Sequence, residues 1–332
     1  MKLLILGGTE FVGRAITEAA LRRGWPVTVF HRGRHAPLPG VEVRHGDRTA
    51  PGGLSALAGG EWDAVVDTWS AAPRVVRDAA RALAGRAGHY LYVSTRSVYA
   101  DPVAPGATEE APLVEGSPDG EQTEYAQDKR GAELAVEAAF AGSALFARAG
   151  LILGPHENVG RLPWWLNRIA RGGDVLAPGP RDLPLQYIDV RDLATWVLDA
   201  ASARLGGAYN LVSPSGHATM GSLLDACARV TGSAANLRWL DPGEILAAGI
   251  EPWTELPIWL PPGEDHDMMH RADVTKALNT GLRCRPVGET VADTWHWLRS
   301  VGEAPLRADR PRPGLTPEAE AKALASRGSR TP

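Results

Sequence analysis

The first half of the chain alternates short apolar runs with segments in which apolar residues recur every three or four positions. Leu3–Leu6 is wholly apolar, as expected of a strand that is buried on both faces of a sheet. Phe11–Arg23 has helical spacing and ends at Gly24. This alternation predicts a parallel, doubly wound α/β sheet with helices on both faces. Further strands are expected at Val27–Phe30, Val41–Val43, Ala64–Val66 and Tyr90–Val93, with a sixth bracketed by Ala144–Phe146 and Leu151–Leu153, and further helices at Val75–Leu83 and Glu124–Phe140.

Beyond Pro155 the regular alternation is lost, and the pattern predicts shorter, mixed elements. Pro252–Pro262 is rich in proline and tryptophan and predicts an irregular loop. Asp273 has the position of an N-cap for a helix over Val274–Asn279, with Gly281 as its stop. The other expected elements are a loop and helix within Asn158–Gly173, a strand at Gln186–Ile188, a helix at Val190–Ala200, and short elements at Tyr209–Val212, Gly221–Val230 and Leu237–Leu240.

Glycines gather where the first strand meets the first helix, in the order Gly-Gly-x-x-x-x-Gly from Gly7 to Gly13. In that context a glycine loop predicts a dinucleotide site, because the helix N-terminus offers free N–H groups to a pyrophosphate. An ordinary glycine-rich turn is the alternative. Glu10 stands where a middle glycine is usual, and its carboxylate opposes a diphosphate unless it points outward or the loop is remodelled. The expected contacts are Gly7, Thr9, Glu10, Phe11, Val12 and Gly13.

The end of the second strand carries bases where NAD enzymes usually offer an acid to the ribose 2′-hydroxyl. The residues there are His31, Arg32, Gly33 and Arg34. Two guanidinium groups suit a 2′-phosphate, which predicts NADP as the cofactor and leaves NAD open. A solvated basic loop is the alternative. We also expect the cofactor to meet Asp47 and Arg48 after the third strand, near the adenine, and Thr68 after the fourth.

Tyr125 and Lys129 are four residues apart on a predicted helix, so their side chains share one face. A lysine ammonium beside a phenol stabilises the phenolate, which makes tyrosine a usable acid or base near neutral pH. The segment from Tyr92 to Ala100, just past the fifth strand, supplies hydroxyl groups to hold a substrate oxygen. An exposed i, i+4 pair is the alternative for Tyr125 and Lys129 alone.

In this order of motifs the chain resembles the extended short-chain dehydrogenase/reductase family, also called NAD-dependent epimerase/dehydratases. The resemblance covers Met1 to about Gly216, and its glycine loop is similar to an atypical branch. It implies that Thr95, four residues before Tyr99, is the catalytic hydroxyl. It also implies that Tyr125 is the general acid/base and that Lys129 holds the nicotinamide ribose.

The same resemblance implies a Rossmann domain followed by a smaller α/β substrate-binding subdomain. We expect the Rossmann domain to comprise residues 1–155 and about 183–203, and the subdomain residues 156–182 and about 204–302. Residues 303–332 are rich in proline, arginine and alanine, and we expect a loosely held tail with one helix near Pro317–Leu324.

Two departures narrow the reaction. In related sugar dehydratases an acid pair follows the catalytic threonine, but here Arg96 and Ser97 follow Thr95, so that dehydration is not expected. In nucleotide-sugar epimerases an arginine grips the pyrophosphate where this chain has Leu185, which disfavours a nucleotide-sugar substrate. Arg161 or Arg181 is left open as a substitute cation.

Tryptophans dominate the segments expected to line the substrate cleft, which suggests an apolar or aromatic substrate. Packing alone is the alternative for any single one of them. His266 and His270 have the spacing of a helical zinc site, but no helix is expected before Asp273, so we predict no metal and a loop over the cleft. The expected substrate contacts are Trp69, Ser97, His156, Trp164, Trp165, Trp253 and Trp259.

Composition excludes several other classes. The 332 residues carry a net charge of −4, without the basic excess that nucleic-acid binding usually requires. No run of about eighteen apolar residues exists, so no membrane span is expected. The two cysteines, Cys227 and Cys284, are too few for a disulfide framework. We therefore expect a cytoplasmic enzyme with a small-molecule substrate, and leave a homodimer open.

Three functions are compatible with these motifs. The first is an NADP-dependent reductase or dehydrogenase acting on a carbonyl or alcohol of a small metabolite. The second is a redox-neutral epimerase that keeps its nicotinamide cofactor bound. The third is a non-catalytic nucleotide- or RNA-binding protein on a degenerate dinucleotide fold, which Glu10 supports and the Thr95, Tyr125 and Lys129 set opposes.

Overall fold

The structure, a computed structural model, describes residues 1–328 and divides the chain into two compact units. The first unit comprises Met1–Gly150, Val190–Val212 and Asp273–Arg283. The second unit comprises the rest, so the first unit includes a segment, Asp273–Arg283, that the sequence places in the C-terminal subdomain. The reason is local: Asp273 donates its backbone N–H to the Ala107 carbonyl and accepts a hydrogen bond from the Asn210 side chain.

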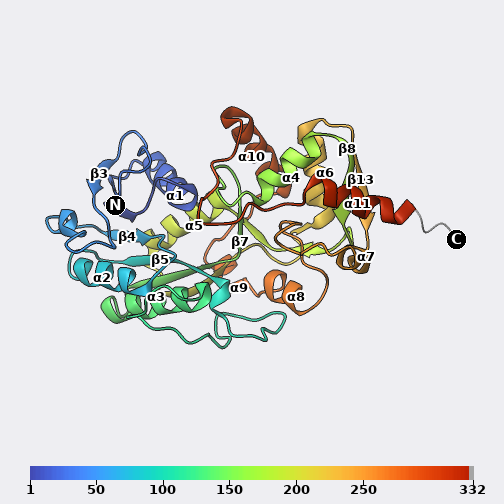
Figure 1. The fold of residues 1–332 in the computed structure, drawn as a ribbon. Coiled ribbons are helices and arrows are strands. Elements are labelled where there is room, and N and C mark those ends of the chain that lie inside the picture. The colour runs from blue at the N-terminus through green and yellow to red at the C-terminus, as the bar shows by residue number, and fades with distance from the viewer. Residues whose placement is uncertain (329–332) are drawn as a thin grey trace. The chain divides into compact units, whose positions relative to one another are not determined.

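The first unit is built on one seven-stranded sheet in which every neighbouring pair of strands is parallel. The strand order is β11-β6-β5-β4-β1-β2-β3, which confirms the predicted doubly wound sheet (Figure 1). Its central strands β1 and β4 are wholly buried and are apolar except for Asp67 at the end of β4, as expected of parallel strands covered on both faces. The strands are β1 (Leu3–Leu6), β2 (Val27–His31), β3 (Glu42–His45), β4 (Ala64–Asp67), β5 (Tyr90–Thr95), β6 (Ala144–Ala149) and β11 (Gly207–Leu211).

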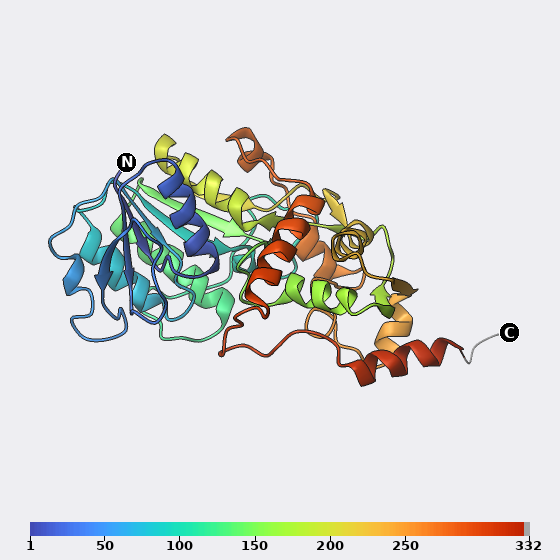
Figure 2. The ribbon, with the colours of Figure 1, turned by 90° about the horizontal axis from the view of Figure 1, so that it is seen from above.

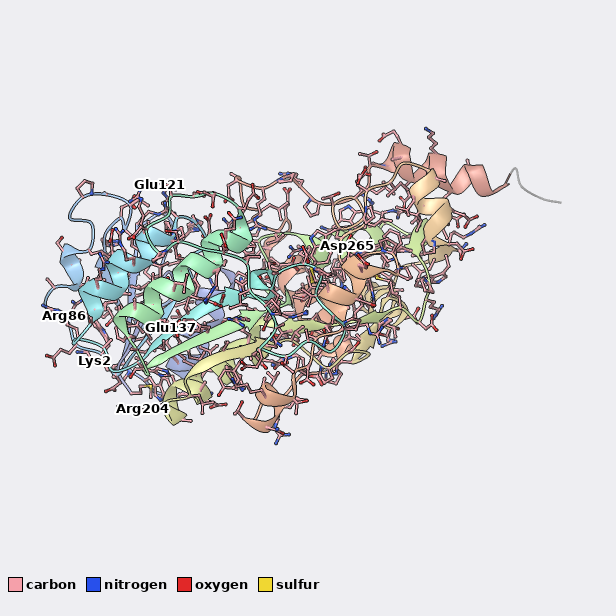
Figure 3. All side chains as sticks on the ribbon, turned by 90° about the horizontal axis from the view of Figure 1, so that it is seen from below. Lys2, Arg86, Glu121, Glu137, Arg204 and Asp265 are labelled. Carbon is pink, nitrogen blue, oxygen red and sulfur yellow. The ribbon has the colours of Figure 1, made fainter. Side chains whose placement is uncertain are left out.

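Helices cover both faces of this sheet. On one face α1 (Phe11–Arg22) lies beside α5 (Val190–Ala203), as Figure 2 shows. On the other face α2 (Pro73–Leu83) packs against α3 (Tyr125–Ala139). Figure 3 views the unit from this side, with both helices in front of the strands and Glu137 on the exposed side of α3. The remaining helical pieces are the 3₁₀ turns η1 (Ser55–Leu57) and η2 (Arg96–Val98) and the short α9 (Thr275–Asn279).

The second unit has three two-stranded pairings instead of one large sheet. β7 pairs with β10 and β8 with β13 in parallel, and β9 pairs with β12 in antiparallel fashion. The strands are β7 (Leu151–Leu153), β8 (Gly173–Pro178), β9 (Pro184–Leu185), β10 (Tyr187–Asp189), β12 (Ala218–Thr219) and β13 (Ala235–Leu240). The helices are α4 (Arg161–Ala170), α6 (Met220–Thr231), α7 (Pro242–Ala247), α8 (Glu264–His270), α10 (Val287–Val301) and α11 (Pro317–Gly328).

Two expectations change in this region. The sixth predicted strand is two strands, because β6 joins the large sheet whereas β7 pairs with β10 in the second unit. Residues Glu264–His270 form helix α8, where a loop is predicted. Figure 3 labels Asp265 on this helix. No helix within residues 1–328 is long and apolar enough to cross a membrane.

The C-terminal segment is anchored, in contrast to the loosely held tail that the sequence predicts. Its helix α11 places the Glu320 carboxylate 2.6 Å from the Arg168 guanidinium, and both side chains are about nine-tenths buried. Glu320 also accepts the backbone N–H of Leu176. Leu315 and Ala323 join the apolar core of the unit. Residues 329–332 of the predicted tail lie outside the described residues.

A buried carboxylate begins helix α4. Glu157 is fully buried, and its two oxygens accept the N–H groups of Arg161 at 2.7 Å and Leu162 at 3.2 Å. These are donors that a helix N-terminus leaves without intrahelical partners. Burial raises the pKa of Glu157 to about 7, although the nearby Arg161 charge and the backbone N–H groups oppose that shift.

The raised pKa predicts that stability falls as the pH rises. The folded chain holds the Glu157 proton up to about pH 7, whereas an unfolded chain releases it near 4.5. The stability that this proton contributes is therefore fully present below the unfolded-state pKa of Glu157. It is lost as the pH rises through the folded-state pKa, and the loss amounts to up to ~3 kcal/mol. Glu157→Gln should remove this pH dependence in urea melts between pH 4.5 and 8. The exposed Glu289, in the first turn of α10, gives a control: Glu289→Gln should keep the wild-type profile. An unchanged profile in Glu157→Gln would contradict the assignment.

Candidate active site

The predicted cofactor residues follow five adjacent strands at their carboxyl ends. In parallel sheets this is the edge at which ligands bind. The glycine loop follows β1, the basic loop follows β2, and Asp47 follows β3. Thr68 and Trp69 follow β4, and Thr95 is the last residue of β5. The topology therefore brings these segments to one edge of the sheet.

The glycine loop fits a bound diphosphate because two of its glycines occupy positions at which a side chain would clash with neighbouring atoms. Gly7 has φ +117°, and a Cβ there would lie 2.4 Å from Thr68 Oγ1. A Cβ on Gly13 would lie 2.5 Å from the Gly8 nitrogen, so the helix start packs directly on the turn. Thr9, Phe11 and Val12 are partly exposed around this turn. The loop has the close strand-to-helix turn that pyrophosphate binding requires.

Glu10 is turned toward a histidine. It is the N-cap residue of α1, but its side chain makes no capping hydrogen bond. The carboxylate is half-exposed and lies 3.8 Å from Nδ1 of His35. The condition under which a carboxylate is tolerated in this loop, that it points outward, is thus met.

The basic loop after β2 surrounds Asp47 with positive charge. Arg32 and Arg34 are exposed, and hydrogen bonds from Thr49 together with the charges of both arginines lower the pKa of Asp47. His31 is buried, accepts the Gly33 N–H at 3.1 Å and has its ring 4.9 Å from that of His45. Burial and the neighbouring histidines lower the pKa of His31. The loop therefore presents two solvated guanidinium groups next to His31, whose charged form is disfavoured by burial.

Arg48 has a different environment from the adenine contact expected of it. Its guanidinium makes two 2.7 Å hydrogen bonds to the Asp67 carboxylate, and the two side chains are 6% and 0% exposed. Sequence reasoning missed Asp67, which ends an apolar strand and carries no motif of its own. A buried carboxylate needs a cation, and Arg48 supplies it.

Helix α3 places Tyr125 and Lys129 on one face. Tyr125 is the first residue of the helix and is 41% exposed. Lys129, one turn later, is 3% exposed and donates to the carbonyls of Trp69 at 2.6 Å and Val93 at 2.7 Å. Its Nζ lies 4.6 Å from the centre of the Tyr92 ring, and Tyr125 is within electrostatic range of the same ring. The Tyr125 phenol and the Lys129 ammonium thus both lie near the buried Tyr92.

Thr95 and Ser97 form a hydroxyl pair at the end of β5. Thr95 Oγ1 accepts the Ser97 N–H and donates to Ser97 Oγ, both at 3.2 Å. Between them Arg96 is buried, and burial lowers the pKa of its guanidinium to about 10. Thr95 is itself nearly buried, whereas Ser97 is exposed.

A buried ion pair fixes α3 to the strands behind it. Glu133, one turn after Lys129, accepts two hydrogen bonds from Arg148 of β6 at 3.0 and 2.9 Å. It also accepts the hydroxyl of Ser94, the neighbour of Thr95, at 2.7 Å. Because Glu133 is fully buried, sliding or rotating the helix would leave a charge unpaired.

Most residues proposed to line an aromatic pocket have packing roles. Trp165 and Trp259 are fully buried and donate their indole N–H groups to the carbonyls of Pro257 and Gly179. Trp164 packs edge-on against Trp165, with ring centres 4.6 Å apart. The basis for an aromatic substrate is therefore removed for these tryptophans, since apolar burial in the second unit accounts for them.

The other residues proposed to contact the substrate also interact with groups of the protein itself. Trp69 donates its indole N–H to the Ala72 carbonyl, and Arg48 lies over its ring. The His156 ring is 5.1 Å from that of Trp297, and the Arg161 guanidinium lies over Trp253. These contacts within the protein do not identify the substrate.

The two histidines of α8 make hydrogen-bonding contacts with backbone groups in and just after strand β9. His266 Nε2 lies 2.9 Å from the Pro184 carbonyl, and His270 Nδ1 accepts the Gln186 N–H at 3.0 Å. His266 also lines a pocket of about 520 Å³ together with Asp267 and Arg271. No group of three or more His, Cys, Asp or Glu side chains within the described chain is arranged to hold a metal ion.

The comparisons with known proteins agree with this geometry. A family model described as "NAD dependent epimerase/dehydratase family" matches residues 3–211. The fold is similar to that of the Bordetella bronchiseptica enzyme WbmH in complex with NAD⁺ (TM-score 0.68, 18% identity, covering 91% of this chain and 99% of that one). It is also similar to UDP-N-acetylglucosamine 4-epimerase from Bacillus cereus (TM-score 0.66, 17% identity, 90% and 99% covered). A third similar structure is B. bronchiseptica WbmG in complex with NAD and UDP (TM-score 0.65, 17% identity, 94% and 99% covered). No curated protein matches the chain.

The position of Glu10 predicts that it weakens cofactor binding modestly. Glu10→Gln removes a charge near the diphosphate site, so affinity for NADPH should rise about threefold at low salt and less at high salt. Titration followed by tryptophan fluorescence measures this. Glu18→Gln, on the same helix and paired with Arg14, should leave affinity unchanged. A loss of affinity in Glu10→Gln would show that the carboxylate assists binding.

Proposed function

The chain belongs to the NAD-dependent epimerase/dehydratase family, and we propose that it transfers hydride between a nicotinamide cofactor and a carbon bearing a hydroxyl or carbonyl group. The observation that supports this most is the placement of Lys129. Its ammonium is held by the carbonyl of Trp69, just after β4, and by that of Val93, within β5, on the same helix face as Tyr125. Thr95 ends the strand to which Lys129 is bonded.

The chain's own groups would then divide the proton chemistry. When bound, the nicotinamide accepts or gives the hydride. Tyr125 exchanges a proton with the substrate oxygen, and its exposure at the start of α3 leaves its hydroxyl accessible. Thr95 donates a hydrogen bond to the same oxygen as negative charge develops there. Lys129 holds the nicotinamide ribose and supplies the positive charge beside the phenol.

We propose NADP as the cofactor and a net oxidation or reduction of the substrate as the reaction. The support is the basic loop, where Arg32 and Arg34 are exposed beside Asp47. Guanidinium groups bind a 2′-phosphate in bidentate fashion, whereas a ribose 2′-hydroxyl is usually bound by an acid. The substrate would be a small carbonyl or hydroxy compound.

A redox-neutral epimerase is the second candidate. It is favoured by the solved structures of similar fold, which include a UDP-N-acetylglucosamine 4-epimerase and WbmG in complex with NAD and UDP. Against a nucleotide sugar stands Leu185, which is buried in β9 where an arginine would grip the pyrophosphate. Arg181, one substitute cation, pairs with Asp225. Cofactor retained through purification without net NADPH consumption would favour this second function.

The cofactor proposal predicts a selective loss. Replacing both Arg32 and Arg34 by alanine should weaken NADPH binding at least about tenfold and leave NADH binding within twofold, because only the 2′-phosphate contacts are removed. Calorimetric titration of both cofactors measures the ratio. Arg81→Ala, an exposed arginine on α2, is the matched control. Equal weakening of NADPH and NADH would count against NADP.

The catalytic proposal predicts a split between binding and turnover. Tyr125→Phe should lower turnover by about 10²-fold or more while NADPH affinity changes less than twofold, because only the proton-transferring hydroxyl is lost. NADPH oxidation with a panel of aldehydes and ketones, and interconversion of UDP-sugars, cover both candidate reactions. Turnover retained in Tyr125→Phe would refute the assignment. Failure of the wild type to bind either cofactor would favour a non-catalytic binding protein.

A further inference from the structure

The carboxylate of Asp67, at the end of β4, has four hydrogen-bond donors around it. Oδ1 accepts from Arg48 at 2.7 Å and from the Trp69 N–H at 2.9 Å. Oδ2 accepts from Arg48 at 2.7 Å and from the Tyr90 hydroxyl at 2.6 Å. The Arg48 guanidinium also lies 5.2 Å from the centre of the Trp69 ring. Both oxygens of this buried carboxylate are thus fully hydrogen-bonded, although the buried Nε of Arg48 has no hydrogen-bond partner among the described residues. Displacing either side chain would leave a buried charge without its partner.

The backbone of Trp69 connects this pair to Lys129. Its N–H donates to Asp67, and its carbonyl accepts from Lys129 Nζ at 2.6 Å and from the Tyr92 hydroxyl at 2.9 Å. The second carbonyl bonded to Lys129 is that of Val93, which lies within strand β5. Of the two acceptors, only the Trp69 carbonyl lies in a loop after its strand. The Asp67 bond to the Trp69 N–H therefore fixes this loop from one side, and the Tyr92 hydroxyl holds the carbonyl itself.

We propose that Arg48 and Asp67 are positioning residues for Lys129: through the Trp69 backbone they determine where the ammonium stands. The inference rests on the proposed role of Lys129 in holding the nicotinamide ribose. It assigns Arg48 to the nicotinamide half of the cofactor site, although its position after β3 suggests the adenine half. These two roles make opposite predictions for the two halves of the cofactor.

Fragments of the cofactor separate the roles without any need for a substrate. The variant is Arg48→Lys, which keeps the charge but loses the two parallel hydrogen bonds. If Arg48 positions Lys129, the variant should bind reduced nicotinamide mononucleotide about fivefold more weakly than the wild type does. Its affinity for 2′,5′-ADP should be unchanged. If Arg48 contacts adenine, 2′,5′-ADP binding should weaken instead, and this result would overturn the proposal. Equal weakening of both fragments would overturn it too, since that indicates a general loss of structure.

Lys129→Met provides the reference. It should weaken the nicotinamide fragment at least as much as Arg48→Lys does, and the double variant should be no weaker than Lys129→Met alone, because both act through one ammonium. If Lys129→Met has no effect on this fragment, the proposed role of Lys129 fails. If Lys129→Met weakens binding and Arg48→Lys does not, only the positioning inference fails.

Two further variants control for misfolding of Arg48→Lys. Tyr90→Phe removes one of the four hydrogen bonds to Asp67 and keeps the ion pair, so it should weaken the nicotinamide fragment in the same direction by a smaller factor. If Arg48→Lys does not fold, this variant decides, and an unchanged affinity overturns the inference. Arg168→Lys makes the same substitution in the buried pair with Glu320 in the second unit. It should lower thermal stability and leave both fragments bound as in the wild type.

Discussion

A buried ammonium is the constraint on which the rest of the site depends. Lys129 is almost fully removed from water, and a cation in that environment is tolerated only if its donors are satisfied. The carbonyls of Trp69 and Val93 and the face of the Tyr92 ring supply this compensation. These groups come from two neighbouring strands and the loop after one of them. The ammonium therefore requires α3, β4 and β5 to stand in one arrangement.

Two buried carboxylates maintain that arrangement from opposite sides. Glu133 is bonded to Arg148 and Ser94, which fixes the rotation of α3 relative to β5 and β6. Asp67 is bonded to Arg48 and fixes the loop after β4. Buried ion pairs often add little net stability, because desolvation offsets their attraction. Their consequence here is geometric, since each pair forbids a displacement that would move Lys129.

What could be predicted from the sequence was local. Leu3–Leu6 is confirmed as a strand because an unbroken apolar run identifies a buried parallel strand without reference to other segments. Tyr125 and Lys129 could be placed on one face because helical periodicity is a property of neighbouring residues. The pairing of Arg48 with Asp67 could not be predicted, because the two are 19 residues apart and only the fold brings them together.

The errors have the same origin. Helix α8 begins after Gly263 without a side-chain N-cap, and most of its residues are polar, so no start signal or apolar period marks it. It exists because His266 and His270 bond to the backbone of Pro184 and Gln186, about eighty residues earlier. The helix near Pro317–Leu324 is confirmed as α11, but its anchoring was not predicted, because Glu320 becomes a buried ion only against Arg168, 152 residues away.

The two departures from a usual dinucleotide loop compensate one another electrostatically. A carboxylate at Glu10 adds negative charge beside the expected diphosphate, and the missing acid after β2 leaves positive charge at Arg32 and Arg34. His35, in the same basic loop, has its Nδ1 3.8 Å from the Glu10 carboxylate. The Glu10 side chain is thus turned toward the basic loop, whose Arg32 and Arg34 side chains are exposed. With Glu10 alone the site would repel an anion, and with the arginines alone it would attract anions without distinction. With NADP as the proposed cofactor, the arginines would bind the 2′-phosphate while Glu10 lies near the diphosphate, so the two charges would act on different phosphates.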